Sequence, residues 1–317
     1  MWPLKAGVQR GAPWERIMRF ERLDLNLLVA FDALIEDRSV SMAAKRLFLS
    51  QPALSGALNR LRDFFGDELL VPSGRQMIPT PKAEELRGPV REALMLIRSR
   101  ITTPSTFDPA TADRLFSLAA SDYAYNVLLA RVMAEASKVA PNVKFELTPT
   151  GPLSMERFER GEIDLLITIS GYLLDGHPTC PLYEDEHAII CWSGGKHAAG
   201  ITEQGFFEAS HVVAFFGPER HPAFTETYFA QQGLRRQIAV RLPTFAAMPQ
   251  AVIGTDHVAT MYRRHAEYFA AFLPIAVHEP PVAMPRIRED GQWHSTRKSD
   301  HGLQWLLGLV QRTAETV

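Results

Sequence analysis

The sequence is poor in cysteine, with only Cys180 and Cys191 among 317 residues. Two cysteines exclude a disulfide framework and a zinc site built from four cysteines. We expect both to be free, buried thiols of a protein that resides in the reducing cytoplasm. A surplus of charge is missing as well, because 34 Lys and Arg stand against 36 Asp and Glu. The overall charge therefore favours neither a nucleic acid nor a membrane as partner.

Long apolar runs and familiar catalytic motifs are also missing. No uninterrupted apolar run reaches the ~18 residues that a membrane helix needs, and the N-terminus lacks the apolar segment of a secretory signal. There is no G-x-S-x-G elbow, no G-x-G-x-x-G or Walker loop, and no H-E-x-x-H motif. We therefore expect no enzyme activity, no metal site, no cofactor and no membrane partner. An enzyme and a stand-alone small-molecule binding protein remain the alternatives from other functional classes.

The sequence does contain enough apolar material for a sizeable core. Apolar residues make up 46% and charged residues 22%, which is ordinary for a folded protein, and the length predicts two or more domains. Residues 1–17 contain two prolines and two glycines and show no periodic pattern. Met18 stands directly before the first patterned segment. This extension is either a functional arm or the product of a misassigned start codon.

Three segments with apolar residues at helical spacing follow. They cover Leu23–Arg38, Met42–Phe48 and Gln51–Phe65, and Ser39 or Ser41 can cap the second. Short helices, a tight turn and a last helix with polar side chains at its N-terminal end are typical of a helix-turn-helix, in which that end enters the major groove. A solvated helix face is the alternative interpretation of the same pattern.

The start of the third segment carries side chains that suit DNA. The Gln51 amide can pair with an adenine edge, and the hydroxyls of Ser50 and Ser55 suit phosphates or bases. Residues 68–79 are predicted to form a hairpin with a glycine turn. Beside a helix-turn-helix such a hairpin is a wing, and Arg75 at its tip can reach a phosphate or the minor groove. The candidate DNA-binding residues are Ser41, Ser50, Gln51, Pro52, Ser55, Asn59, Arg62 and Arg75.

These segments carry a specific resemblance. The N-terminal signature of LysR-type transcriptional regulators is matched in order and spacing by Leu23–Leu28, Ser41–Leu47, Leu49–Ser55, Leu58–Leu61 and Pro79–Pro81. The opening LDLNLL and a looser similarity over most of the chain resemble the branch of nodulation (NodD-like) and aromatic-degradation (NahR-like) regulators. The resemblance implies an α/β protein with an N-terminal winged helix-turn-helix, a long linker helix and a two-lobed effector domain of periplasmic-binding-protein type.

This resemblance and the sequence pattern together divide the chain. After the extension 1–17 we expect a winged helix-turn-helix domain, a linker and dimerisation helix, and an effector-binding domain. Their bounds are 18–79, 80–101 and 102–317, with lobe one formed by 102–176 plus 282–317 and lobe two by 177–281.

The linker helix is predicted to begin at Thr80 and Pro81 and to run to about Ile101. Its apolar stripe includes Leu86, Val90, Leu94, Ile97 and Ile101. Because the winged unit ends before this helix, we expect the stripe to pack on the same helix of a second chain. Packing inside one chain is the alternative. A two-fold pair of recognition helices would read an inverted repeat in promoter DNA.

Strand-like and helix-like segments alternate beyond this helix, which predicts a mostly parallel sheet. In such sheets a ligand binds beyond the carboxyl ends of the strands, where helix N-termini converge. Ser121 and His211 also match positions of the inducer sites of the family. N-capping without ligand contact is the alternative for Ser121 and Thr244. The candidate effector-binding residues are Ser121, Asp122, Thr148, His211, Phe216, Thr244 and Phe245.

The expected effector is a small aromatic inducer, because aromatic lining suits a planar ring. The acidic run Glu184–Glu186 favours a neutral phenol, hydroquinone or flavonoid-like ring over a carboxylate if one of these acids faces the cleft, although exposure to solvent is the alternative. The resemblance implies a homodimer or homotetramer that works with RNA polymerase and activates neighbouring, catabolic genes. A flavonoid-responsive nodulation-type regulator or a repressor is the alternative.

Overall fold

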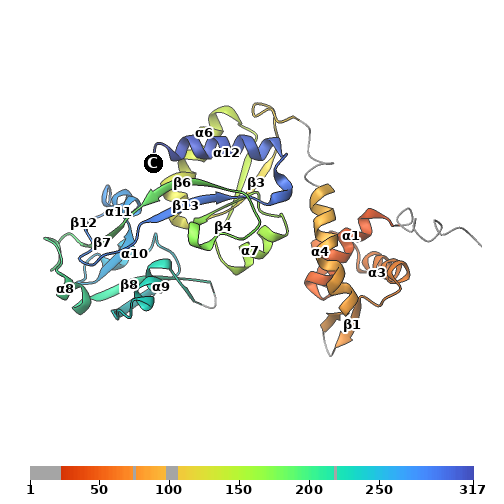
Figure 1. Cartoon of the computed structure of the whole chain (residues 1–317), viewed down its shortest axis with the longest axis horizontal. Helices are drawn as coiled ribbons and strands as arrows, with labels where there is room; N and C mark the ends of the chain where they lie inside the picture. Colours follow the sequence, from red (N-terminus) through yellow and green to blue (C-terminus); the bar gives the residue numbers. More distant parts are fainter. Residues whose placement is uncertain (1–22, 74–75, 98–105, 218–219) are drawn as a thin grey trace, which may run out of the picture. The chain divides into compact units, whose positions relative to one another are not determined.

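Figure 1 shows the fold of the chain in a computed structural model. The chain forms two compact units, residues 1–98 and residues 99–317. The predicted extension 1–17, Met18, Arg75 and the end of the predicted linker helix lie outside the described residues. None of the helices in the described part is both long and apolar enough to cross a membrane. The described residues are 23–73, 76–97, 106–217 and 220–317.

The first unit begins with three helices, and each starts where a side-chain oxygen caps it. Asp24, Ser39 and Ser50 accept hydrogen bonds from backbone N–H groups in the first turns of these helices. The structure therefore selects Ser39, not Ser41, as the cap of the second helix. A two-stranded hairpin and a fourth helix, capped by Thr80, follow. The elements are α1 (Leu25–Asp37), α2 (Val40–Arg46), α3 (Gln51–Phe65), β1 (Leu70–Ser73), β2 (Gln76–Pro79) and α4 (Pro81–Leu96).

The fourth helix belongs to the core of the first unit, contrary to our argument that no core could bury its apolar stripe. Val90 and Leu94 are each 6% exposed and pack in one cluster with residues of α1, α2 and α3. Arg91 fastens α4 to α1, because its Nε donates to Asp32 at 2.9 Å and its Nη2 donates to Glu36 at 2.6 Å. The apolar stripe of α4 consequently does not by itself indicate a second chain.

The first lobe of the second unit is built on a five-stranded sheet in the order β4-β3-β5-β13-β6. Helices α6 and α12 cover one face of this sheet and α7 covers the other (Figure 1). The strands are β3 (Leu115–Ala119), β4 (Lys144–Thr148), β5 (Leu165–Ile169), β6 (Thr179–Asp185) and β13 (Ile287–Gln292). The helices are α5 (Asp122–Ala124), a π-helical turn (Tyr125–Leu129), α6 (Ala130–Val139), α7 (Pro152–Glu159) and α12 (His301–Ala314).

The second lobe has its own sheet in the order β10-β8-β11-β7-β12, with the short β9 paired to β8. Alternate residues of its central strands face opposite layers of helices. The strands are β7 (His187–Trp192), β8 (Ser210–Phe216), β9 (His221–Pro222), β10 (Gln237–Leu242), β11 (Val258–Tyr262) and β12 (Ile275–His278). The helices are α8 (Glu203–Glu208), α9 (Phe224–Gln231), α10 (Met248–Val252) and α11 (Arg263–Ala270).

Both sheets are mixed, which corrects the expectation of a mostly parallel sheet. β13 runs antiparallel to β5 and β6, and β7 runs antiparallel to β11 and β12. The pairing of β6 with β13 also keeps residues 179–185 in the sheet of lobe one. The chain therefore first crosses between the lobes at Glu186, later than the boundary that we placed after residue 176. It returns through residues 279–286.

Candidate functional site

The exposed side of α3 forms the candidate DNA-binding face. Leu54, Leu58 and Leu61 turn to the core and leave the opposite side of the helix to solvent. Gln51 and Pro52 are exposed in the first turn, directly after the cap at Ser50. The N-terminal end of a helix carries unpaired backbone N–H groups and a partial positive charge, both of which favour contact with a phosphate. The structure thus places these three predicted residues at an end suited to DNA.

Three further predicted residues extend this face. Ser55 and Asn59 follow Gln51 at intervals of four residues, so they lie along one side of α3. Ser55 is half-buried, whereas Asn59 is exposed. Ser41 is exposed on α2, with its hydroxyl oxygen 3.1 Å from that of Ser39. The predicted residues therefore form a polar row on α3 and one neighbouring position on α2.

Arg62 differs from the other predicted residues of α3. Its Nε donates to the backbone oxygen of Glu68 at 2.9 Å, and its Nη2 donates to the backbone oxygen of Leu70 at 2.9 Å. The guanidinium group also lies 3.2 Å from the Glu68 carboxylate. Because these donors are engaged within the chain, Arg62 ties α3 to β1 and is not presented to DNA as we expected.

One exposed residue beside this face was missed by the sequence reasoning. Phe48 is 96% exposed in the turn between α2 and α3, where its φ of 55° is unusual for a residue other than glycine. Leu49, which follows Phe48 in the chain, and Met42 on α2 are also exposed. We had placed Phe48 at the end of α2. The sequence did contain a signal for this exposure, because Phe48 is an aromatic residue that does not fit the apolar periodicity of either α2 or α3.

The candidate effector site lies where the two lobes meet. Asp122 begins α5 in the first lobe, and its Oδ2 accepts a hydrogen bond of 2.6 Å from the backbone N–H of Ala246 in the second lobe. Burial raises the pKa of Asp122 in spite of this bond. Ser121 caps α5 by accepting from the N–H of Ala124, so its capping role is real. One turn later, the Asn126 amide donates to His265 Nε2 at 3.0 Å.

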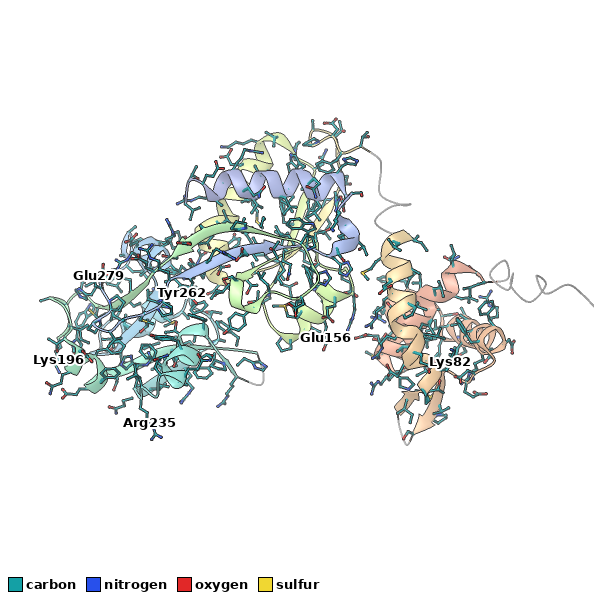
Figure 2. All side chains as sticks on the ribbon, in the orientation of Figure 1. Lys82, Glu156, Lys196, Arg235, Tyr262 and Glu279 are labelled. Carbon is teal, nitrogen blue, oxygen red and sulfur yellow. The ribbon has the colours of Figure 1, made fainter. Side chains whose placement is uncertain are left out.

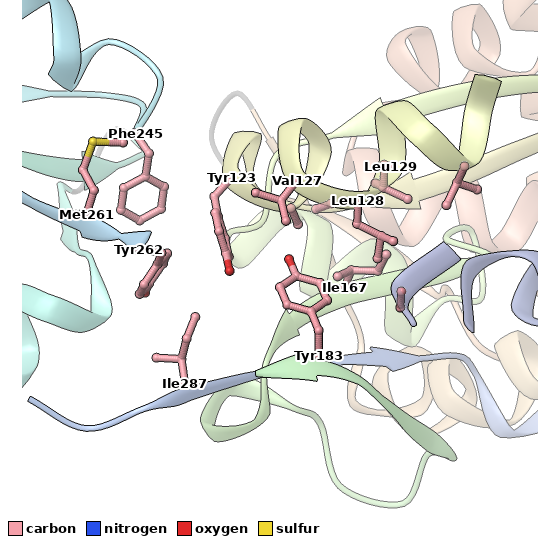
Figure 3. Packing of buried hydrophobic residues seen from close by; sticks show 14 of the residues in the cluster. Tyr123, Val127, Leu128, Leu129, Ile167, Tyr183, Phe245, Met261, Tyr262 and Ile287 are labelled. Carbon is pink, nitrogen blue, oxygen red and sulfur yellow. The ribbon is translucent and has the colours of Figure 1, made fainter. Parts of the chain in front are cut away.

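Aromatic rings from both lobes fill this junction. The ring of Tyr123 in lobe one lies 4.6 Å from that of Tyr262 in lobe two, and 6.2 Å from that of Tyr183. Phe245 contacts Tyr262 at 5.6 Å and Phe216 at 5.1 Å, again between ring centroids. Figure 2 labels Tyr262 between the lobes, and Figure 3 shows the rings gathered around it. This packing combines two predicted residues, Phe216 and Phe245, with three tyrosines that the sequence did not reveal.

Two other predicted residues lie at the edge of this junction. Thr148 ends β4 and pairs in register with Ala119, which places it beside the start of α5. Its hydroxyl accepts a hydrogen bond from Arg157 Nη1 at 3.1 Å. Thr244 is exposed and immediately precedes Phe245. The structure thus brings Ser121, Asp122, Phe216 and Phe245 together, with Thr148 and Thr244 at the margin.

His211 is not part of this group. It lies at the N-terminal end of β8, whereas Phe216 ends the same strand and faces the junction. The side chain is fully buried, its Nε2–H donates to the oxygen of Phe206 at 2.7 Å, and burial lowers its pKa to about 4. His211 therefore stabilises the interior of lobe two, and the structure does not support our placement of it in the effector site.

The acidic run at the end of β6 divides between solvent and the junction. Glu184 is exposed, but Asp185 is buried and accepts a hydrogen bond of 2.7 Å from the Tyr123 hydroxyl. It also accepts from the backbone N–H groups of Glu186 and Arg264. Burial raises the pKa of Asp185. Of the acidic run, Asp185 is the acid that lies at the junction.

Within the described ranges, no group of three or more His, Cys, Asp or Glu side chains could hold a metal ion. Cys180 and Cys191 are buried free thiols. The groups that the junction can offer to a ligand are aromatic faces, hydroxyl groups and buried carboxyl groups.

Comparison with known proteins agrees with both halves of this arrangement. Residues 25–84 match the model of the bacterial regulatory helix-turn-helix protein, lysR family, and residues 110–315 match the LysR substrate binding domain. The chain belongs to the LysR family. The expectation of a DNA-binding transcriptional regulator with an effector-binding domain, and not of an enzyme, is confirmed for this LysR-type protein.

Full-length relatives of this LysR-type regulator are nodulation proteins. The chain is 36% identical to nodulation protein D 1 of Bradyrhizobium sp. (strain NC92), over 94% of this chain and 95% of that protein. It is 37% identical to nodulation protein D 2 of Rhizobium tropici, over 94% of this chain and 95% of the relative. The resemblance to the nodulation-type branch is therefore confirmed.

A solved structure supports the predicted fold class. A probable transcriptional regulator from Pseudomonas aeruginosa aligns with a TM-score of 0.61 at 30% identity, covering 93% of this chain and 98% of that one. Full-length OxyR from the same organism aligns with a TM-score of 0.68 at 15% identity, covering 92% and 95% of the two chains, and shows the fold alone. The α/β class with an N-terminal helix-turn-helix and a two-lobed effector domain is confirmed.

Proposed function

We propose that this LysR-type regulator senses a small, neutral aromatic inducer between the two lobes of its effector domain. The observation that carries the proposal is the convergence of Tyr123, Tyr262 and Phe245 from opposite lobes at one junction. Planar rings stack favourably against such side chains. Polar bonds such as those between Asp122 and Ala246 and between Asn126 and His265 join the lobes there. A ring that replaces these contacts changes the angle between the lobes.

The change in the angle between the lobes is expected to alter transcription. In the proposed mechanism the chains form a homodimer or homotetramer in the cytoplasm, and paired α3 helices bind an inverted repeat in promoter DNA. Inducer binding alters the spacing of these helices and the bend of the DNA, which allows RNA polymerase to transcribe neighbouring catabolic genes. The regulator acts as an activator in this scheme.

A second candidate is a nodulation-type regulator that responds to a flavonoid, either as activator or as repressor. The names of the relatives over nearly the full length of the chain favour it. Both candidates share a neutral, hydroxylated ring as inducer, and they differ in its size and in the genes controlled.

The test combines ligand binding with DNA binding by the full-length protein. Thermal melting is measured with phenols, hydroquinones, flavonoids and aromatic carboxylates, and gel shifts are measured with DNA from upstream of the regulator's own gene. We expect a neutral ring to raise the melting temperature and to change expression of a reporter fused to that DNA. Flavonoids acting where single rings do not would favour the second candidate.

Gln51→Ala provides the control that separates the two units. Loss of a bidentate base contact is expected to weaken specific DNA binding about 10-fold or more, at ~1–3 kcal/mol, while stabilisation by the ligand is unchanged. The proposal fails if no aromatic compound alters melting or reporter expression. Equal loss of both functions in Gln51→Ala would contradict the division between the units.

A further inference from the structure

Within the described residues, one oxygen of a buried carboxyl group at the lobe junction lacks a hydrogen-bond partner. Glu289 is on β13, directly opposite Tyr183 of β6, so both side chains project from the same face of the strand pair. Only 2% of Glu289 is exposed. Among the described residues, its Oε2 has no hydrogen-bond partner. Buried polar atoms are normally satisfied, so such an atom points to an absent partner.

Two tyrosine hydroxyl groups at the same junction share this property. Within the described part of the chain, the hydroxyl oxygens of Tyr183 and Tyr262 are buried without a hydrogen-bond partner. The side chains of Tyr123 and Thr225 interact with Tyr183 and Tyr262 respectively, and each interaction lowers the pKa of the tyrosine against the raising effect of burial. Figure 3 shows the side chains of Tyr123 and Tyr183 directed toward one another between the lobes. Glu289 and these two tyrosine hydroxyls are therefore buried polar groups gathered among the aromatic rings of the junction.

The charges around Glu289 determine which polar group it accepts. Burial, together with Asp290 on the same strand and Asp185 on β6, raises the pKa of Glu289 to about 8. The other titratable groups that interact with it are the tyrosines of α5, β6 and β11. At neutral pH the carboxyl group is consequently protonated, and it can both donate and accept a hydrogen bond.

A ligand anion is poorly accommodated at this place. Burial, which is the main reason that Glu289 keeps its proton, also disfavours a ligand carboxylate, and the charges of Asp290 and Asp185 add to this effect. The backbone N–H of Ala246, a natural site for an anion, is already occupied by the carboxylate of Asp122. A neutral hydroxyl group avoids both obstacles, because it donates and accepts without carrying charge.

We infer that Glu289, with the hydroxyl groups of Tyr183 and Tyr262, determines the specificity of the effector site for a neutral, hydroxylated aromatic ring over an aromatic carboxylate. The inference rests on the proposed function, because it assumes that the ring binds at this junction. It adds the residues that select the ligand class.

Calorimetry on the full-length protein at pH 7 tests the ligand class with two matched series. The first compares 4-hydroxybenzamide with 4-hydroxybenzoate, and the second compares a hydroxyflavone with the carboxylic acid of the same flavone. We expect the neutral member to bind at least ~10-fold more tightly in each series that binds. Equal or tighter binding of a carboxylate, or no binding of either neutral compound, overturns the inference.

Substitutions test the residues. Glu289→Leu is expected to weaken binding of the neutral ring ~10-fold or more, since it removes both hydrogen-bonding atoms. Glu289→Gln keeps a donor and an acceptor and is expected to stay within about 3-fold of the original affinity. Tyr183→Phe removes one hydroxyl without changing shape, so it tests the site even if Glu289→Leu fails to fold. The matched control is Glu184→Gln, on the exposed face of the same strand pair.

The outcomes separate this inference from the proposed function. Wild-type binding of a neutral ring that is unchanged in Glu289→Leu and Tyr183→Phe overturns the role of these residues and leaves aromatic sensing intact. A higher melting temperature of Glu289→Leu with unchanged affinity shows that the carboxyl group only destabilises the interior, and it also overturns the role. No binding of any ring, with no reporter response, rejects both.

Discussion

Three acids at the lobe junction have pKa values raised by desolvation: the half-buried Asp122 and the buried Asp185 and Glu289. Asp122 and Asp185 accept several hydrogen bonds, which partly offset the cost of burying their charge. The Oε2 of Glu289 has no such bond among the described residues. At the scale of single residues, Glu289 is therefore the acid of these three whose protonation most affects the free energy of unfolding.

The free energy of unfolding is expected to show this dependence on pH. In the unfolded chain Glu289 titrates near its ordinary value of 4.5, whereas in the folded chain its pKa is about 8. The folded protein thus holds a proton that the unfolded chain has released, and its stability falls as pH rises from about 4.5 to about 8. The slope is up to ~1.4 kcal/mol per pH unit. Urea unfolding at a series of pH values measures it.

Glu289→Gln is the comparison that isolates this effect. His187, His211 and His265 have pKa values lowered by burial, so they destabilise the fold as pH falls below about 6.5. They are present in both proteins and cancel in the difference. The stability difference between Glu289→Gln and the original protein should widen with pH through this window. Parallel curves would contradict the raised pKa.

Individual site residues were predictable to different degrees. Gln51 and Ser50 follow from local motifs, because helix start and polar face are encoded within a few residues. His211 was misplaced because a strand segment in the sequence does not reveal which of its ends faces the ligand. Tyr262 and Glu289 come from distant strands, and no local pattern brings them to Tyr123.

At the scale of elements, Arg62 joins α3 to the hairpin. In Arg62→Ala the backbone oxygens of Glu68 and Leu70 lose their donor, which we expect to destabilise the contact between helix and strand by ~1–3 kcal/mol. Hydrogen exchange of peptides that cover residues 59–73 in the full-length protein should become about 10-fold faster or more.

Arg60→Ala is the matched control for this change. Arg60 lies on the same helix, is mostly exposed, and is 3.8 Å from the Asp24 carboxylate, a distance typical of weak surface pairs. Its loss is expected to leave exchange near the original rate. If Arg60→Ala accelerates exchange as much as Arg62→Ala, the specific link between α3 and β1 is not responsible.

Regular helices were predicted more closely than strands. α3 has the predicted bounds, because helical spacing of apolar residues is a strong signal. β6 and β13 were not predicted. Pro181 and Gly291 interrupt the pattern of strand-forming residues, and the acids Glu289 and Asp290 make the buried strand β13 appear polar in the sequence. The apolar stripe of α4 was ambiguous for another reason. Its pattern requires a partner surface but does not say whether that surface belongs to the same chain.

At the scale of the whole molecule, we expect the full-length protein to act on DNA as a multimer. Sedimentation should give a dimer or a tetramer, and a footprint on its own upstream DNA should protect two half-sites about one helical turn apart or a multiple of it. Affinity should fall steeply with added salt, because phosphate contacts release counterions. A monomer with no preference for this DNA at low salt would contradict the proposed mechanism.

The two crossings between the lobes limit how the effector domain can move. β6 and β13 are bonded to each other as far as Asp185 and Ile287, so bending is confined to Glu186 and residues 279–286. The latter segment contains three prolines, and its Pro285 oxygen accepts a hydrogen bond from His187. One connection is a single residue and the other is stiff and anchored. An inducer is consequently expected to rotate one lobe against the other by a few degrees. Such a rotation is too small to expose the apolar core to water. It nevertheless displaces the far end of the effector domain, because displacement grows with distance from the bending point.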